Sequence, residues 1–248
     1  MLRNGQTEEP LGVDTHEKLD ELISQWARRH LHQGRCFIKD GIIDADRWKT
    51  TAPKVLALLK EGRHEGLSTS WDLREYIRKD IRENGRLTGP ALKNTSYWCY
   101  AIHHVARGRL RGFPVGTAAL DQAVELFLSS ALVNIKKSGG KAQSSFAELA
   151  EYARADGDLL RQQIELIDPD IVICGYTWPH VKHLWPEAKN AAFEGVWRVG
   201  RRVFLDFWHP GHRIADDLKY YAFACLLQNS DALFKLDLPK SKQPKSQG

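Results

Sequence analysis

The sequence predicts an α/β fold of three layers, αβα, around a central, mostly parallel four-stranded sheet. Short apolar runs alternate with longer amphipathic segments along the chain. The runs are apolar throughout, as in strands that are buried on both faces of a parallel sheet. With 248 residues, 42% of them hydrophobic, the chain is long enough for one core. We expect a single domain over residues 1–238 and a disordered basic tail over 239–248.

The first part of the chain, residues 14–50, is expected to be a helical cover over a core that spans 51–230. Its clearest element is the segment 14–30, DTHEKLDELISQWARRH, which begins with an aspartate cap. Its apolar residues Leu19, Leu22, Ile23 and Trp26 share one helical stripe. This stripe would pack on the core.

Four apolar runs are typical of buried strands. They are 54–59 (KVLALL), 131–135 (ALVNI), 170–175 (DIVICG) and 202–207 (RVFLDF). Ligands bind outside the carboxyl ends of parallel strands, where loops converge. We therefore expect the site among the segments KEGRH, NIKKSGG, GYTW and HPGHR.

Amphipathic segments between these runs predict the helices. They cover 71–83, 94–106, 118–128, 145–167 and 214–228. Ser145 and Glu148 have the spacing of a capping box, and Asp168-Pro169 ends that helix.

Charge and hydropathy narrow the function classes. The net charge of +5 and a pI near 9.0 fit a polyanionic partner such as DNA. No run of about eighteen apolar residues and no leader-like start is present, so we expect a cytoplasmic protein without a membrane partner. Nothing in the sequence indicates an obligatory protein partner.

Neither a metal nor a cofactor is expected. The cysteines lie far apart without a CxxC pair and are interpreted as buried thiols, with an iron–sulfur cluster as the open alternative: Cys36, Cys99, Cys174 and Cys225. The histidines that a metal site would use lack a familiar ligand spacing: His103, His104, His209 and His212. Nucleotide-binding GxxxxGK[ST] and GxGxxG patterns are absent from the sequence.

Three residues near strand ends can carry chemistry on a glycosidic bond. Glu61 can orient water or stabilise a sugar cation, although a strand-end ion pair is the alternative. Asn134 offers a donor and an acceptor to a base edge, or holds a turn. A neutral His209 can donate a hydrogen bond to an oxygen that gains negative charge, or be an inert loop residue.

In this order, the motifs resemble those of the uracil-DNA glycosylase superfamily over about residues 50–230. The GQDPYH motif of that family resembles 59–64 (LKEGRH), its LLN motif resembles 132–134 (LVN), and its HPSPL motif resembles 209–213 (HPGHR). The resemblance implies a uracil-DNA glycosylase-like domain in which Glu61 and His209 are catalytic and Asn134 reads the base. The target nucleotide would be flipped into a pocket, with Arg213 filling the gap in the helix.

The same resemblance supplies the remaining site residues. Those expected to bind the substrate are Lys60, Gly62, Arg63, His64, Asn134, Pro210 and Gly211. Those expected to contact the DNA are Lys136, Lys137, Ser138, His212 and Arg213.

Departures from the family pattern concern the choice of base. Leu59 replaces the first glycine, Gly62 the proline, and Arg63 the tyrosine that closes the pocket against 5-substituents. A hydrogen-bonding Arg63 would suit a pyrimidine with a bulky polar 5-substituent. The expected enzyme is a monofunctional DNA glycosylase, a hydrolase that cleaves N-glycosidic bonds and leaves an abasic site, in anti-phage defence or base-excision repair.

Two other functions remain open. A non-catalytic DNA-binding or sensing protein would keep the fold and the basic loops without the chemistry. A hydrolase of small nucleosides or nucleotides would act without a DNA strand and with little dependence on salt, whereas phosphate contacts make binding strongly salt-sensitive.

Overall fold

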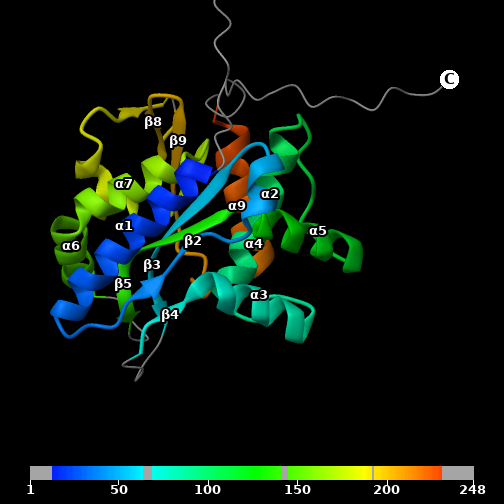
Figure 1. The fold of residues 1–248 in the computed structure, drawn as a ribbon. Helices are drawn as coiled ribbons and strands as arrows, with labels where there is room; N and C mark the ends of the chain where they lie inside the picture. The colour runs from blue at the N-terminus through cyan, green and yellow to red at the C-terminus, as the bar shows by residue number, and fades with distance from the viewer. Residues whose placement is uncertain (1–12, 64–68, 141–144, 192, 231–248) are drawn as a thin grey trace, which may run out of the picture.

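The computed structural model describes residues 13–63, 69–140, 145–191 and 193–230. A mostly parallel sheet lies between two layers of helices, which confirms the predicted α/β class (Figure 1). The predicted tail at 239–248 and His64 lie outside the described residues.

The central sheet has seven strands in the order β2-β5-β3-β6-β9-β8-β7. Their bounds are Gly41–Ile42, Ala131–Gly140, Val55–Arg63, Ile171–Gly175, Arg202–Phe207, Val196–Val199 and Lys189–Asn190, in that order. The predicted strands form the parallel centre, β5-β3-β6-β9. The expectation of a four-stranded sheet is wrong, because β2, β7 and β8 extend both edges as antiparallel strands.

Those added strands have only two to four residues, so their sequence shows no readable period. Two further short strands, β1 (Ile38–Lys39) and β4 (Trp71–Asp72), pair in parallel as a separate sheet. The segment 14–50 is therefore not a purely helical cover, because it contains β1 and β2.

β3 and β5 run further than the sequence predicts. β3 continues to Arg63 and β5 to Gly140, so KEGR and KKSGG belong to the sheet and not to loops. Glu61 lies opposite Lys136 in the parallel register, and their side chains form an ion pair. Charged residues that would end an isolated strand are thus paired with each other across the sheet.

Helices cover both faces of the sheet (Figure 1). On one face lie α1 (Val13–His32), α6 (Phe146–Ala155) and α7 (Gly157–Ile167). On the other lie α3 (Leu73–Asn84), α4 (Pro90–Val105), α5 (Thr117–Leu128) and α9 (Asp216–Gln228). The short helices are α2 (Ala45–Thr50), α8 (Trp178–Val181) and the 3-10 helix η1 (Lys182–Leu184).

The helix predicted over 145–167 is broken into α6 and α7. Asp156 leaves the helical conformation, with φ −115° and ψ 12°, and its carboxylate lies 3.0 Å from Nε2 of His30. A Cβ on Gly157 would lie 2.6 Å from Cδ2 of Leu184, so a larger residue where the chain turns would have to displace that side chain. Both causes are tertiary contacts.

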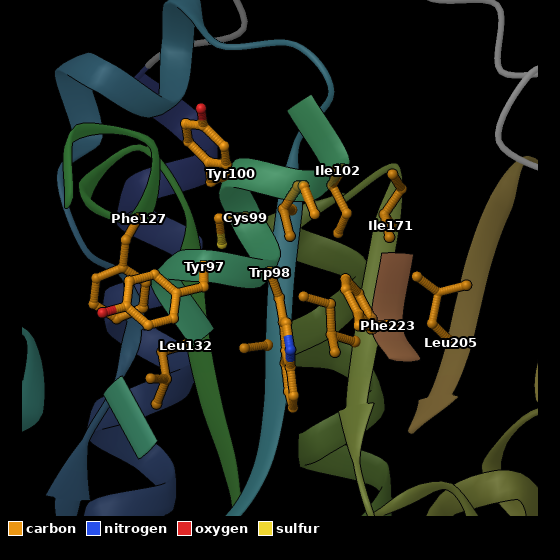
Figure 2. Close-up of a cluster of buried hydrophobic side chains, with 14 of the residues drawn as sticks. Tyr97, Trp98, Cys99, Tyr100, Ile102, Phe127, Leu132, Ile171, Leu205 and Phe223 are labelled. Carbon is orange, nitrogen blue, oxygen red and sulfur yellow. The ribbon is translucent and has the colours of Figure 1, made fainter. Parts of the chain in front are cut away.

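α4 forms the centre of the core on its face of the sheet. Twelve of its residues are buried, from Asn94 to Val105. Its Trp98 stacks on Phe223 of α9 with ring centroids 5.0 Å apart, while Leu132, Ile171 and Leu205 approach from the sheet (Figure 2). This packing anchors α9 beneath the loop that follows β9.

Candidate functional site

The strand order predicts where a ligand would bind. The chain leaves β3 toward β5 on one side, whereas it leaves β6 toward β9 on the other, and β3 and β6 are neighbours. Such a reversal opens a crevice outside the carboxyl ends of the two strands, where ligands bind in open α/β sheets. Glu61 lies at the end of β3, Tyr176 directly after β6, and His209 two residues after β9.

Glu61 is held against the neighbouring strand. Its side chain is 6% exposed, and Oε2 lies 3.3 Å from Nζ of Lys136. A Cβ on Gly140 would lie 2.2 Å from Cδ of Glu61, so glycine at 140 makes room for this carboxylate. The buried Oε1 has no hydrogen-bond partner among the described residues, which leaves one acceptor open to a ligand or a water.

Lys136 places a positive charge beside this carboxylate. Its Nζ also contacts Oε1 of Glu148, at 2.7 Å. Burial acts against the lysine charge, but the hydrogen bond to Glu148 and the charge of Glu61 together raise the pKa of Lys136. A cation therefore stands beside Glu61 at neutral pH.

Asn134 offers a donor on the next strand. It is 2% exposed and lies opposite Leu59, two residues before Glu61 in the register, or about 7 Å along the strands. Its backbone N–H donates to Oδ2 of Asp40, at 2.8 Å. Its buried Nδ2 has no partner in the part of the chain that the structure describes. Asn134 and Glu61 thus present an unpaired donor and an unpaired acceptor near one sheet edge.

His209 is a neutral donor. Its Nδ1 accepts the backbone N–H of Gly211, at 3.1 Å, so the proton of the neutral ring is on Nε2. Burial, with the positive charges of Lys60 and Lys219 and the nearby His212, lowers the pKa of His209 to about 4. At neutral pH the ring therefore donates through Nε2–H without carrying a charge.

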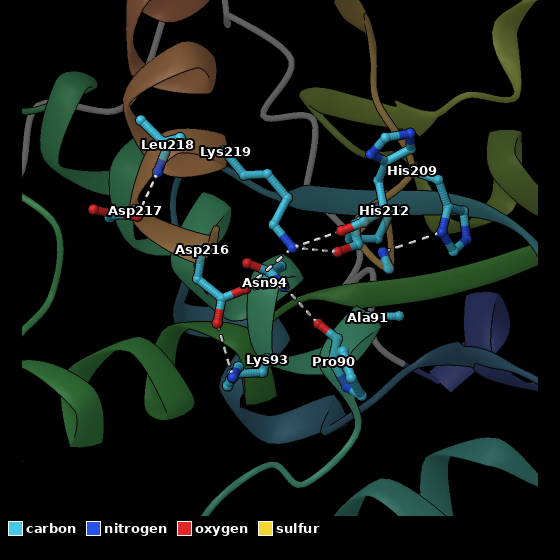
Figure 3. Close-up of polar contacts among 12 residues, drawn as sticks. Pro90, Ala91, Lys93, Asn94, His209, His212, Asp216, Asp217, Leu218 and Lys219 are labelled. Carbon is cyan, nitrogen blue, oxygen red and sulfur yellow. Dashed lines mark hydrogen bonds and ion pairs between the residues drawn. The ribbon is translucent and has the colours of Figure 1, made fainter. Parts of the chain in front are cut away.

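A buried lysine positions the His209 loop (Figure 3). Lys219 of α9 donates to the carbonyl oxygens of Pro210, at 3.3 Å, and His212, at 3.1 Å, and pairs with Oδ1 of Asp216, also at 3.1 Å. Asn94 of α4 donates to the same carboxylate oxygen, at 3.0 Å. Sequence reasoning missed Lys219. The available signal was its place on the apolar stripe of α9, together with Phe223 and Leu226.

The loop after β6 packs against the loop after β9. A Cβ on Gly175 would lie 3.0 Å from Cδ of Pro210. The hydroxyl of Thr177 donates to the carbonyl of Leu58 in β3, at 2.9 Å. Nζ of Lys60 lies 4.9 Å from the ring centroid of Tyr176, and burial, partly offset by Glu61, lowers the pKa of Lys60. The predicted residues Lys60, Pro210 and Gly211 therefore lie near the carboxyl ends of β3 and β9.

Other predicted residues do not reach it. Lys137 is fully buried, and its Nζ pairs with Oδ1 of Asp40, at 2.5 Å, and with Oε1 of Gln163, at 2.8 Å. Ser138 is 7% exposed and shares a hydrogen bond with the hydroxyl of Tyr152. The predicted contact of Lys136, Lys137 and Ser138 with DNA is not supported, because their polar groups are buried and already paired within the protein.

Gly62 and the HPGHR segment (209–213) lie in different places. A Cβ on Gly62 would lie 3.0 Å from Ile38 and 3.4 Å from Trp71, so this residue faces β1 and β4. Beyond Trp71, a groove of about 780 Å³ follows α3, but neither Glu61 nor His209 lines it. Arg63 ends β3, and its side chain lies outside the described residues.

His212 and Arg213, at the end of the His209 loop, are both exposed. The ring of His212 stacks beside Trp208, with centroids 6.4 Å apart. Their predicted contact with DNA stays a prediction.

No cluster of three or more metal-ligating side chains occurs among residues 13–63, 69–140, 145–191 and 193–230. Cys36, Cys99, Cys174 and Cys225 are free thiols, and Cys225 is exposed, contrary to the expectation that all are buried. Of the helices in the described part, none is long and apolar enough to cross a membrane. Comparison of the chain with family models, curated proteins and solved structures finds no match.

Proposed function

We propose that the protein is a DNA glycosylase that binds a flipped pyrimidine and hydrolyses its N-glycosidic bond, leaving an abasic site. The observation that carries the proposal is the state of His209, a neutral imidazole with its N–H on the side away from the loop. Glu61 and Asn134, each with a polar atom that no other described residue bonds, lie on the neighbouring strands β3 and β5.

These groups match the charges that form when the bond breaks. The departing base gains negative charge on an oxygen, which the Nε2–H of His209 can stabilise by a hydrogen bond. The sugar becomes an oxocarbenium-like cation, which the carboxylate of Glu61 can stabilise while its free oxygen orients the attacking water. The amide of Asn134 can bond the base edge and select the base.

A modified pyrimidine is the proposed target. Arg63, the last residue of β3, follows Glu61 and Gly62 at the position where the family has the tyrosine that closes the pocket. A guanidinium there can donate to a polar 5-substituent such as a hydroxymethyl or glucosyl group. Such bases occur in phage DNA, so defence against phage is the proposed role.

The test is incubation of the protein, without added metal, with uracil-containing, unmodified and glucosylated hydroxymethylcytosine DNA. Alkali-sensitive abasic sites and released base are scored. We expect sites on the glucosylated DNA, whereas sites on uracil DNA alone would retain the glycosylase and reject the modified base. Binding to DNA with no base release on any substrate would favour the non-catalytic DNA-binding function.

Variants test the roles of the residues. His209→Ala removes the proposed oxyanion donor and is expected to lower kcat about 100- to 1,000-fold. Glu61→Gln is expected to lower it at least about 100-fold. The matched control is His183→Ala, at an exposed histidine of η1, which should retain full activity.

The dependence on pH follows from the lowered pKa of His209, about 4. Because the neutral ring is the active form, kcat should not change as the pH falls through 6.5, and should fall only as the pH approaches 4. An activity that rises below pH 6.5 would instead show that the imidazolium is needed, and would contradict the mechanism.

A further inference from the structure

Two exposed aromatic rings stand just after the carboxyl ends of β6 and β9. Tyr176 is 51% exposed and Trp208 is 43% exposed. Trp208 is the exposed one of the eight tryptophans of the chain, all of which lie in described residues. Gly175 and Phe207 are partners in the register of β6 and β9, so these rings come from adjoining positions after neighbouring strands.

Both rings are held by the structure below them. The N–H of Tyr176 donates to the carbonyl of Phe207, at 2.7 Å, which ties the two loops together. Trp208 stacks on Phe207 with centroids 5.2 Å apart and planes at 30°, and Phe207 packs on Phe223 of the core. The rings are therefore pre-organised, which lowers the entropy lost when a ligand binds.

Tyr176 has a backbone conformation that its side chain does not favour. Its φ is +58°, in the left-handed region that bulky residues rarely adopt. An exposed ring contributes little to the core, so folding alone gives no reason for a tyrosine at this position. A ligand that uses the ring would supply one.

Cations accompany the rings. Nζ of Lys60 lies 4.9 Å from the ring centroid of Tyr176, and the exposed Arg213 follows Trp208 by five residues. His209 lies between Trp208 and Arg213 in the sequence. Aromatic rings for bases and cations for phosphates are the combination that binds single-stranded nucleic acid.

We infer that Tyr176 and Trp208 stack on the bases that flank the target, and that single-stranded DNA is the preferred substrate. The inference rests on the proposed function, which brings DNA to this edge of the sheet. In a duplex the flanking bases are already stacked on their neighbours, so the rings can take them only after unpairing, which costs free energy. A single strand offers them freely.

The test measures binding of the full chain to a thymidine oligonucleotide and to the matching duplex, neither of which carries a modified base. We expect the single strand to bind at least about 10-fold more tightly. Tyr176→Ala and Trp208→Ala should each weaken that binding about 10- to 100-fold. Tyr221→Ala, at a ring of α9 that is also 51% exposed, is the control and should bind like the parent.

A spectroscopic signal identifies the ring. Bases that stack on Trp208 should quench its fluorescence, and Trp208→Phe should lose this quenching while it binds within about 3-fold of the parent. Equal affinity of the parent for the single strand and the duplex, or ring variants that bind like Tyr221→Ala, would overturn the inference. Base release is measured separately, so a protein that binds single strands through these rings without cleaving would retain the stacking role of the rings and lose the glycosylase.

Discussion

Two buried lysines lie on opposite faces of the sheet, and their surroundings differ. Lys137 of β5 is fully buried against α1 and α7, with Asp40 and Gln163 as partners. Lys219 of α9 is 2% exposed, but its carboxylate partner Asp216 is 31% exposed. The first network joins core elements to each other, whereas the second joins a helix to the loop of His209.

The network of Lys137 stabilises the fold, whereas the network of Lys219 positions the loop of His209. Removal of one partner of a fully buried ion pair leaves a charge that the protein cannot solvate. In the Lys219 network, water can partly replace a lost partner, because Asp216 reaches the surface. Asp40 also accepts the N–H of Asn134, so the proposed base-reading side of the site depends on the core network. The His209 side can be altered with less damage to the fold.

The largest effect is expected from Asp40→Ala, which leaves Lys137 buried without its carboxylate and with the amide oxygen of Gln163 still in contact. The free energy of unfolding should fall by about 3–5 kcal/mol, measured by urea denaturation. The double variant Asp40→Asn/Lys137→Met should lose less free energy of unfolding than Asp40→Ala alone, because no buried charge then remains. A double variant as unstable as Asp40→Ala would contradict this account of the network.

A smaller loss of stability is expected from Lys219→Met. It removes the donors to the carbonyls of Pro210 and His212, so the free energy of unfolding should fall by about 1–3 kcal/mol. Because the loop of His209 loses its support, kcat should fall. The factor by which kcat falls should be about 10 times the factor by which KM changes. Lys79→Met, at an exposed lysine of α3, is the control for both measurements. An unchanged kcat would show that the loop holds His209 without the lysine.

The smallest effect is expected from protonation of Asp216 at acid pH. Burial acts to raise the pKa of Asp216, but hydrogen bonds from Lys93, Asn94 and Lys219 lower it to about 2 (Figure 3). The unfolded chain binds this proton near pH 3.8, so the stabilisation is complete above about pH 4 and is lost as the pH falls toward 2. Relative to Asp216→Asn, the parent should lose no more than about 2 kcal/mol over that interval, since solvent screens the group. Equal acid sensitivity of the two proteins would exclude the contribution.

Local pattern was sufficient for the parts of the fold that burial determines. The apolar runs predicted β3, β5, β6 and β9 because strands buried on both faces must be apolar throughout. The ends of β3 and β5 were missed because Glu61 and Lys136 neutralise each other only when the strands are paired. The break at Asp156 depends on His30, far away in the sequence.

The same limit applies to the site. The rule that ligands bind at carboxyl strand ends placed Glu61, Asn134 and His209 at one edge of the sheet. The structure has Glu61 near the end of β3 and His209 after β9, whereas Asn134 lies within β5, which continues to Gly140. Their roles stay predictions. The segment KKSGG is typical of a solvated loop. Only the position of Asp40 explains why Lys137 is buried instead. Lys219 was hidden for the same reason, since the carbonyl groups that it binds lie in the loop before α9.

Gly140 limits which residues can stand at positions 61 and 140 in related sequences. Any side chain at this position would occupy the space of the Glu61 carboxylate, since its Cβ would lie 2.2 Å from Cδ of that residue. The two positions should therefore change together during evolution. A homologue that carries a larger residue at 140 is expected to have exchanged Glu61 for a smaller one, so this glycine would mark, in sequence alone, the lineages that keep the acid.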